Sequence, residues 1–338
     1  MRTIEPIDIA DIERARDRIA AVAIRTPLIP LELPGHGRRI WLKLESLQPI
    51  GSFKIRGAAN AMACADPAAL ERGVYTGSAG NMAQGVAYAA RLRGIPCRVV
   101  VPDTAPRTKL DAIARLGATA VPVPFEEWWS VIRDHGHPDE EGFFIHPVSD
   151  PAVIAGNGTV GLEILEDLPE AAAVVVPYGG GGLACGIACA LHARRPGAKV
   201  YAAEVETAAP FAASLDADGP VDVERIASFV DGIGGRGVLP EMWPLASSLL
   251  SGSFVMTLEE VCDAMRLLAA RAHVIAEGAG ACAVAAAAWA ATRLVVGEGG
   301  RAGEREGGSV GEGEIVAVVS GGNIDTAVLL RILAGDTP

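Results

Sequence analysis

The chain has 338 residues, half of them hydrophobic, which is enough for two domains with separate cores. A net charge of −12, from 29 basic and 41 acidic residues, excludes a general nucleic-acid-binding surface. No apolar run approaches the roughly 20 residues of a membrane-spanning helix, and the charged, amphipathic opening segment is neither a signal peptide nor an anchor. Six cysteines without a CxxC pair indicate reduced thiols and a cytoplasmic location.

Short β-branched runs alternate with helical patterns along the whole chain. In the first half, these patterns predict helices over 7–23, 58–63, 82–93 and 109–116, and strands over 40–44, 97–101 and 120–123. In the second half, they predict helices over 157–165, 183–193, 258–271 and 279–289, and strands over 174–176, 199–205 and 315–319. This alternation predicts an α/β fold with mostly parallel sheets that helices cover on both faces. Residues 297–313, nearly all Gly, Glu, Arg and Ser, are expected to form a mobile surface loop.

A single lysine is the first candidate for chemistry. Lys54 lies in the stretch 50–57, between the apolar side chains of Phe53 and Ile55. Apolar neighbours remove hydration from an ammonium group, which lowers its pKa. The neutral amine is the form that condenses with an aldehyde, as in pyridoxal phosphate (PLP) Schiff bases. The alternative is an ordinary solvated lysine beside a turn.

A run of glycines between a predicted strand and a predicted helix is the second candidate. The run comprises Gly179, Gly180, Gly181 and Gly182, and Leu183 follows it. Bare backbone amides at the positive end of a helix dipole bind phosphate, whereas a simple tight turn rarely needs four consecutive glycines. The phosphate ligand stays open at this point. A loose G-x-G-x-x-A pattern, with Glu204 about 20 residues further on, also fits a nicotinamide-dependent oxidoreductase.

Two more turns follow predicted strands. The first contains Ser78, Ala79, Gly80 and Asn81. Ser78 and nearby amides can bind a carboxylate, and Asn81 can donate to a phenolate oxygen, although a helix cap explains the same residues. In the second turn, Ser320 stands at the carboxyl end of a buried strand, where α/β sheets bind ligands. A nicotinamide interpretation leaves the lysine and this serine without a function, whereas a PLP interpretation uses all four stretches.

These stretches resemble those of the threonine/serine dehydratase branch of fold-type II PLP-dependent enzymes, a group that includes serine racemase and the tryptophan synthase β subunit. The match extends from about residue 10 to the end, apart from the glycine-rich insertion. Residues 44–57 resemble the family's Schiff-base segment and residues 78–81 its substrate and cofactor loop. Residues 179–183 resemble its phosphate loop, and residues 320–323 the turn at the pyridine nitrogen.

The resemblance implies a role for individual residues. Lys54 would form the Schiff base, and Phe53 would pack beside the cofactor. Asn81 would contact the ring oxygen, Ser320 the ring nitrogen, and Glu277 would lie near the ring edge. A neutral hydroxyl stabilises a protonated ring nitrogen less well than a carboxylate does, so Ser320 favours elimination of a β-hydroxyl.

Departures from the family pattern narrow the prediction. Met82 stands where a histidine usually follows the asparagine, which affects substrate choice or loop contacts. Ala79 replaces the second serine that racemases use as an acid/base, so racemisation is disfavoured. Pro210 stands where metal-binding members have an acid, so no metal is predicted. Three histidines of one polar loop are likewise not predicted to bind metal: His135, His137 and His146.

The resemblance therefore implies a two-domain PLP-dependent lyase that acts on a small hydroxy amino acid. We expect residues 1–50 and 155–338 to form a large PLP-binding domain, and residues 51–154 a small mobile domain that carries the lysine and the substrate loop. The expected reaction is the dehydration and deamination of L-threonine or L-serine, by a cytoplasmic homodimer. The alternatives are 3-hydroxyaspartate dehydration, serine racemisation, and a catalytically silent relative that only binds metabolites.

Overall fold

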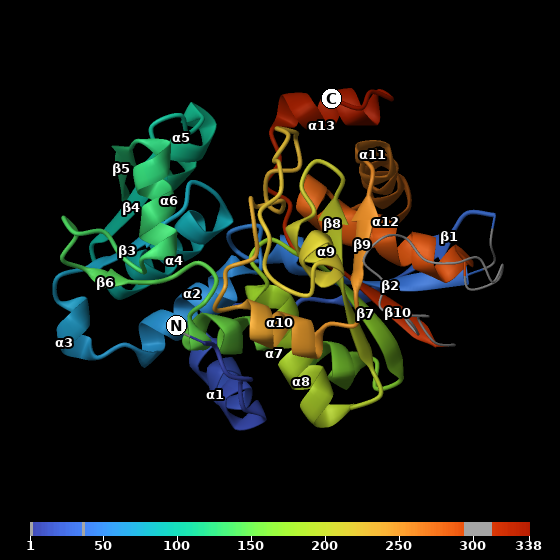
Figure 1. Ribbon diagram of the computed structural model, residues 1–338, viewed down its shortest axis with the longest axis horizontal. Coiled ribbons are helices and arrows are strands. Elements are labelled where there is room, and N and C mark those ends of the chain that lie inside the picture. Colours follow the sequence, from blue (N-terminus) through green and yellow to red (C-terminus); the bar gives the residue numbers. More distant parts are fainter. Residues whose placement is uncertain (1–2, 36–37, 294–312) are drawn as a thin grey trace.

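The computed structural model describes residues 3–35, 38–293 and 313–338, which fold around two β-sheets (Figure 1). A four-stranded sheet has the order β5-β4-β3-β6, and a six-stranded sheet has the order β1-β2-β10-β7-β8-β9. Helices flank both sheets, which confirms the predicted α/β fold with mostly parallel sheets. Nearly all of the stretch 297–313, for which we expected a surface loop, lies outside the described residues.

Every strand pair of the smaller sheet is parallel. Its strands are β3 (Val74–Gly77), β4 (Cys97–Pro102), β5 (Thr119–Val123) and β6 (Phe143–Phe144). The helices of this part of the chain are α2 (Lys54–Cys64), α3 (Pro67–Leu70), α4 (Asn81–Arg93), α5 (Arg107–Arg115) and α6 (Phe125–Arg133). Figure 1 shows them gathered around the smaller sheet, on the left.

The larger sheet is parallel except for one antiparallel pair at its edge, β1 with β2. Its strands are β1 (Leu28–Leu33), β2 (Arg38–Leu44), β7 (Ala171–Pro177), β8 (Lys199–Val205), β9 (Ser253–Met256) and β10 (Glu314–Val319). The remaining helices are α1 (Ile9–Ile19), α7 (Pro151–Asp167), α8 (Gly182–Arg194), α9 (Pro210–Asp216), α10 (Trp243–Leu249), α11 (Leu258–Leu267), α12 (Gly278–Arg293) and α13 (Thr326–Leu333). A 3₁₀ turn at Glu45–Leu47 and a π turn at Leu268–Ala272 complete the described elements.

Alternate residues of β7 show that both faces of the larger sheet are buried. Val174 and Val176 belong to the core formed with α1, α7 and α8. Ala173 and Val175 belong to the opposite core, which contains α11 and α12. A parallel strand that is covered on both faces reads as a continuous apolar run, which is why β7 was predictable.

Several helices differ from the predicted ones in their limits. Helix α2 begins at Lys54, before the apolar pattern that starts at residue 58. Helix α7 begins at Pro151, where the Asp150 side chain accepts hydrogen bonds from the first turn, a local Asp-Pro start signal that periodicity alone passes over. The predicted helix over 258–271 ends at Leu267 and continues as the π turn. Within the described residues, no helix is both long enough and apolar enough to cross a membrane.

We call the four-stranded sheet with its helices the smaller layer and the six-stranded sheet with its helices the larger layer. Helix α2 connects the two layers, since it packs against both α4 and α7. Gly156 of α7 permits the second contact, because a side-chain carbon there would lie 2.5 Å from the Arg56 carbonyl oxygen. Lys54, the first residue of α2, therefore lies on a helix that packs between helices of both layers.

Candidate active site

Lys54 presents its amine to a backbone carbonyl rather than to an acid. Its Nζ donates to the Pro147 oxygen at 3.0 Å and lies 5.1 Å from the centre of the Phe53 ring. Burial lowers the pKa of Lys54 to about 8, and the negative charge of Glu277 only partly opposes this. Within the described residues Lys54 forms no ion pair. The site thus favours the neutral form of this amine more than water does.

The turn that begins at Ser320 is bonded directly to the lysine segment. The Phe53 amide donates to the Ser320 carbonyl oxygen at 3.0 Å, and the Gly322 amide donates to the Gly51 carbonyl oxygen at 2.9 Å. Ser320 is only 2% exposed, and in the described part of the chain its hydroxyl forms no hydrogen bond. A hydroxyl without a protein partner is available to a ligand.

A polar cluster beside the same turn consists of Asn81, Glu277 and Asn323, the last residue of the turn. Asn81 Nδ2 donates to both carboxylate oxygens of Glu277, at 2.9 and 3.1 Å. Asn323 Nδ2 donates to Asn81 Oδ1 at 2.8 Å. Burial raises the pKa of Glu277 to about 7, although the bond from Asn81 acts in the opposite direction. The Asn81 amide is therefore held by Glu277 here, and its contact with a ring oxygen stays a prediction.

The glycine loop follows β7 and opens α8. Gly181 is the N-cap of this helix and has a positive φ of 91°, a conformation that favours glycine. A side-chain carbon at Gly180 would lie 2.5 Å from Val148 Cγ2, so a side chain there would displace the segment that contains Pro147. The first amides of α8 have no partners inside the helix and can receive an anion. Leu183 is buried in the core beneath them.

The four predicted stretches form a closed circuit of contacts. A side-chain carbon at Gly179 would lie 3.3 Å from the Gly232 carbonyl oxygen, and one at Gly232 would lie 3.4 Å from Glu277 Oε1. Glu277 bonds Asn81 in the polar cluster, and the serine turn bonds the lysine segment. Lys54 donates to Pro147, and the segment that contains Pro147 packs against the glycine loop. Sequence reasoning missed Gly232, Pro147 and the part played by Asn323, because none stands in a run that distinguishes it from an ordinary turn.

The turn over residues 78–81 lies at the start of α4. Gly80 is the N-cap residue, and no side chain caps the helix, so the alternative of a simple serine cap is wrong. Ser78 Oγ accepts from the Gly80 amide at 3.1 Å, which leaves its hydroxyl hydrogen free to donate. Ala79 is partly buried beside the core of the smaller layer, and the Met82 side chain lies inside that core.

The Glu204 carboxylate is hydrogen-bonded within the protein and is not placed to bind a ribose. Its buried carboxylate accepts hydrogen bonds from Ser253 Oγ at 2.6 Å and from the amides of Phe211 and Ala212, both at 2.8 Å. The group therefore holds the start of α9 against β9. The nicotinamide interpretation needed Glu204 to bind a ribose, and the structure gives this residue a different role.

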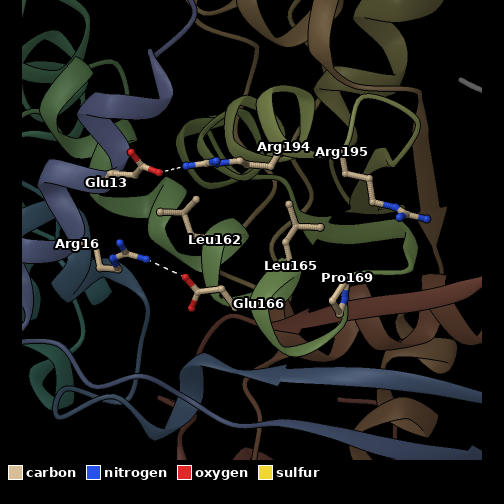
Figure 2. Close-up of a pocket in the computed structure, with 8 residues that line it drawn as sticks. All are labelled: Glu13, Arg16, Leu162, Leu165, Glu166, Pro169, Arg194 and Arg195. Carbon is tan, nitrogen blue, oxygen red and sulfur yellow. Dashed lines mark hydrogen bonds and ion pairs between the residues drawn. The ribbon is translucent and has the colours of Figure 1, made fainter.

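A pocket of about 340 Å³ lies elsewhere, between α1, α7 and α8 (Figure 2). Its arginines face carboxylates: Arg16 bonds Glu166 at 2.8 Å, and Arg194 pairs with Glu13. The complete lining consists of Glu13, Arg16, Leu162, Leu165, Glu166, Pro169, Arg194 and Arg195. None of the predicted site residues lines this pocket, so it is separate from the lysine site.

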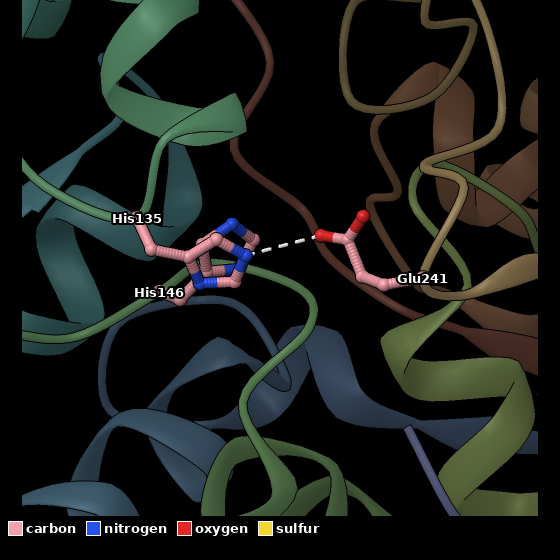
Figure 3. Close-up of side chains that lie close together, drawn as sticks. All are labelled: His135, His146 and Glu241. Atoms are coloured by element: carbon pink, nitrogen blue, oxygen red, sulfur yellow. Dashed lines mark hydrogen bonds and ion pairs between the residues drawn. The ribbon is translucent and has the colours of Figure 1, made fainter. Parts of the chain in front are cut away.

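Two histidines of the loop come together, which the sequence did not predict. His135 and His146 stack with ring centres 4.3 Å apart, and Glu241 brings a carboxylate oxygen to within 4.8 Å of both (Figure 3). The ring nitrogens of His146 are already in use. Nε2 faces the Ile132 carbonyl oxygen at 2.9 Å, and Nδ1 accepts from two backbone amides that follow it. The cluster is a hydrogen-bonded junction between the two layers.

Comparisons with known proteins agree on one family. The family model described as "Pyridoxal-phosphate dependent enzyme" matches residues 19–302. The chain is 38% identical to the L-threonine ammonia-lyase of Thermotoga maritima, over 97% of this chain and 78% of that protein. It is also 38% identical to human serine racemase, over 83% of this chain and 84% of that protein. The structure of maize serine racemase superposes with a TM-score of 0.85 at 30% identity and covers 98% of both chains.

The residues in place suit the cofactor of that family. A desolvated amine suits its aldehyde, the helix start after the glycine loop suits its phosphate, and the buried hydroxyl of Ser320 suits a ring nitrogen. The expected fold-type II architecture and PLP as cofactor are confirmed, and a nicotinamide oxidoreductase is wrong. The chain belongs to the family of pyridoxal-phosphate dependent enzymes.

Proposed function

We propose that this enzyme is an ammonia-lyase that converts L-threonine or L-serine into a 2-oxo acid and ammonia. The observation that carries the proposal is the state of Lys54. Its amine is partly buried, its pKa is lowered to about 8, and it is bonded to a carbonyl oxygen. Such an amine can be linked to the cofactor aldehyde and, once released, can accept a proton. The similarity to an L-threonine ammonia-lyase over 97% of the chain supports the same reaction.

Each group in the circuit has a task in this reaction. When bound, PLP withdraws electrons from the amino acid and makes its Cα–H bond acidic. The glycine-loop amides would hold the phosphate, and the Ser320 hydroxyl would bond the ring nitrogen. Ser78 and the first amides of α4 would hold the substrate carboxylate.

The atoms balance without any further reactant. Lys54 Nζ takes the Cα proton, and the electron pair of the broken Cα–H bond forms the Cα–Cβ double bond as the Cβ–O bond breaks. The hydroxyl takes up a proton, which balances the one removed from Cα, and leaves as water. Hydrolysis of the released enamine consumes one water, so the net products are a 2-oxo acid and ammonia.

Serine racemisation is the second candidate, because human and maize serine racemases are among the similar proteins. Ala79 argues against it. Racemisation needs a second acid/base on the face opposite the lysine, and alanine carries no proton to give. Lys54 alone can remove and return the Cα proton on one face only.

Product analysis with the purified holoenzyme separates these functions. L-threonine, L-serine and L-3-hydroxyaspartate are each incubated with the enzyme, and oxo acid, ammonia and the configuration of the remaining substrate are measured. We expect oxo acid and ammonia in equal amounts from threonine or serine, with the remaining serine still in the L form. Formation of D-serine faster than oxo acid, or no oxo acid from any substrate, would overturn the proposal.

A further inference from the structure

We propose that His146 is a positioning residue, which holds residues 147–149 in the place where they accept the Lys54 amine and support the glycine loop. The inference deepens the proposed function, since it concerns the geometry of the same site. It is carried by hydrogen bonds that no sequence motif indicated.

His146 fixes the backbone on both sides of its ring. It stands just after β6, at the start of the crossover to α7. Its Nε2 donates to the carbonyl oxygen of Ile132 in α6 at 2.9 Å, because a carbonyl can only accept. Its Nδ1 must then be the acceptor, and it receives the amides of Val148 at 3.1 Å and Ser149 at 2.8 Å. One neutral imidazole thus ties the segment to the smaller layer.

The same segment is also tied to the larger layer. Ser149 Oγ donates to Glu241 Oε1 at 3.0 Å, and His135 Nε2 lies 3.1 Å from the same oxygen. Glu241 comes just before α10, and Figure 3 shows its carboxylate pointing at the stacked rings. Burial opposes the charge of Glu241, but the bonds from its own amide, Ser149 and His135 prevail, so its pKa lies below the ordinary value.

The segment held in this way makes two contacts with the active site. The Pro147 carbonyl oxygen receives the Lys54 amine at 3.0 Å. The Val148 side chain packs where a side-chain carbon of Gly180 would be, and its carbonyl oxygen lies 2.9 Å from such a carbon at Gly182. A shift of this backbone would therefore move the acceptor of the amine and one wall of the glycine loop together.

The role of His146 is indirect. The side chain is buried, and both ring nitrogens are used by the backbone of the protein. It therefore acts on the amine through Pro147. A misplacement of about 1 Å at a reacting group can lower turnover by roughly 100-fold, so a positioning residue has a measurable effect on rate.

The test compares four variants as holoenzymes. His146→Leu removes both ring contacts. His146→Asn keeps an acceptor near the Nδ1 position, whereas His146→Gln can still donate to Ile132 from an amide nitrogen near Nε2 but leaves the Val148 and Ser149 amides without their acceptor. The control is His137→Leu, which removes another buried histidine of the same loop. His137 bonds Glu127 at 2.9 Å, and in the described part of the chain it forms no hydrogen bond with residues 147–149. Two readouts are used: kcat and KM for oxo acid formation, and amide hydrogen exchange in peptides covering residues 146–150 and 179–184.

We expect kcat to fall at least roughly tenfold in His146→Leu and His146→Gln, with KM changed by less than about twofold. Exchange should be faster in both peptides of these variants. His146→Asn should recover most of the rate and the protection, and the control should stay near the unmodified enzyme. If His146→Leu does not fold, the contrast between Asn and Gln decides.

Two results would overturn the proposal. One is unchanged exchange and kcat in His146→Gln. The other is a lower melting temperature with unchanged kcat per bound cofactor, which would make His146 a stability residue only. If the unmodified enzyme forms no oxo acid at all, the proposed function fails, and the exchange data alone still show whether His146 holds both segments.

Discussion

Two lysines of the chain, one buried and one partly buried, have opposite surroundings. Lys43, on β2, is fully buried, and its Nζ bonds Glu163 at 2.6 Å and the Thr26 carbonyl oxygen at 2.7 Å. Lys54, at the start of α2, bonds only a carbonyl oxygen among the described residues. Burial lowers the pKa of both amines, but Glu163 opposes this at Lys43 through direct contact. The direct contact with Glu163 favours the charged amine at Lys43, and Lys54 has no such contact within the described residues.

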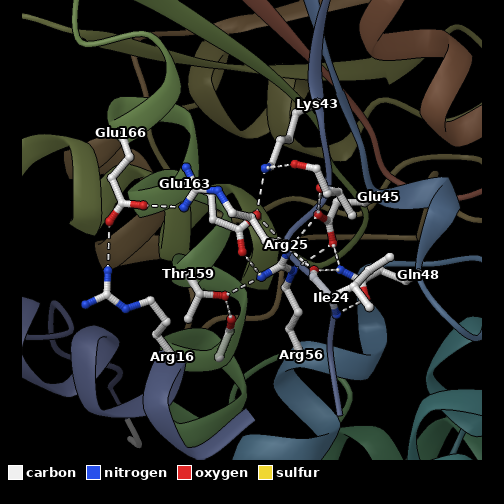
Figure 4. A network of polar contacts seen from close by, with 12 residues as sticks. Arg16, Ile24, Arg25, Lys43, Glu45, Gln48, Arg56, Thr159, Glu163 and Glu166 are labelled. Carbon is white, nitrogen blue, oxygen red and sulfur yellow. Dashed lines mark hydrogen bonds and ion pairs between the residues drawn. The ribbon is translucent and has the colours of Figure 1, made fainter. Parts of the chain in front are cut away.

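The surroundings of Lys43 form a neutral network (Figure 4). Arg56 donates to Glu45 from Nε and Nη2, both at 2.8 Å, and its Nη1 bonds Glu163 at 2.7 Å. Two cations therefore face two carboxylates, all four almost fully buried. Arg56 lies two residues after Lys54 on the same helix, so the network anchors the helix that carries the Lys54 amine.

The largest effect is expected for Lys54→Ala. Removal of the amine should lower oxo acid formation by roughly 1,000-fold or more, because the proposal assigns removal of the Cα proton to Lys54. Folding should be unaffected, since the lost side chain forms no ion pair in the described part of the chain. Turnover is measured beside circular dichroism, with cofactor present at saturation. Near-normal activity would remove Lys54 from its assigned role.

Arg56→Met should act on stability instead. It leaves Glu45 and Glu163 buried with one cation between them, and breaking a buried pair in this way costs about 3–5 kcal/mol. The free energy of unfolding is obtained from urea denaturation. A loss below about 1 kcal/mol would show that the network contributes no more than a surface ion pair does.

The pH dependence of turnover should be governed by the Lys54 amine. A neutral amine is required, so kcat should rise with pH through the pKa of about 8. The Glu277 charge raises the pKa of Lys54, so Glu277→Gln should move the rise to lower pH, by roughly one unit at most. The position of the midpoint is the readout, whatever the absolute rate. A midpoint that stays in place or moves to higher pH would contradict the assignment.

Arg16→Met should have the smallest effect and is the matched contrast to Arg56→Met. Arg16 bonds Glu166 at 2.8 Å, but both side chains are more than two-fifths exposed. Exposed ion pairs contribute about 0.2–1 kcal/mol, so unfolding in urea should barely change. A loss as large as that of Arg56→Met would mean that burial does not separate the two arginines.

The sequence predicted those parts of the site that local patterns encode. Lys54, the glycine loop and Ser320 each stand next to a strand or helix boundary, and such boundaries are visible in short windows. The parallel sheets were predictable from the same alternation of strands and helices.

The rest depends on contacts between distant residues. Nothing local links His146 to Ile132, or Gly232 to Glu277, and only the fold brings them together. Met82, which the sequence suggested would affect substrate choice or loop contacts, has its side chain in the core, and its effect on the loop stays a prediction. The expected domain limits, the dimer and the contacts of bound PLP stay predictions.

Borohydride reduction of the purified holoenzyme, followed by peptide mass spectrometry, tests the role of Lys54 most directly. The chain has four lysines, Lys43, Lys54, Lys109 and Lys199, so each can be followed individually. Reduction should abolish the visible absorption band and leave a cofactor-sized mass increase on Lys54 alone. A mass increase on Lys43 or another lysine, or a band that reduction does not change, would contradict the role assigned to Lys54.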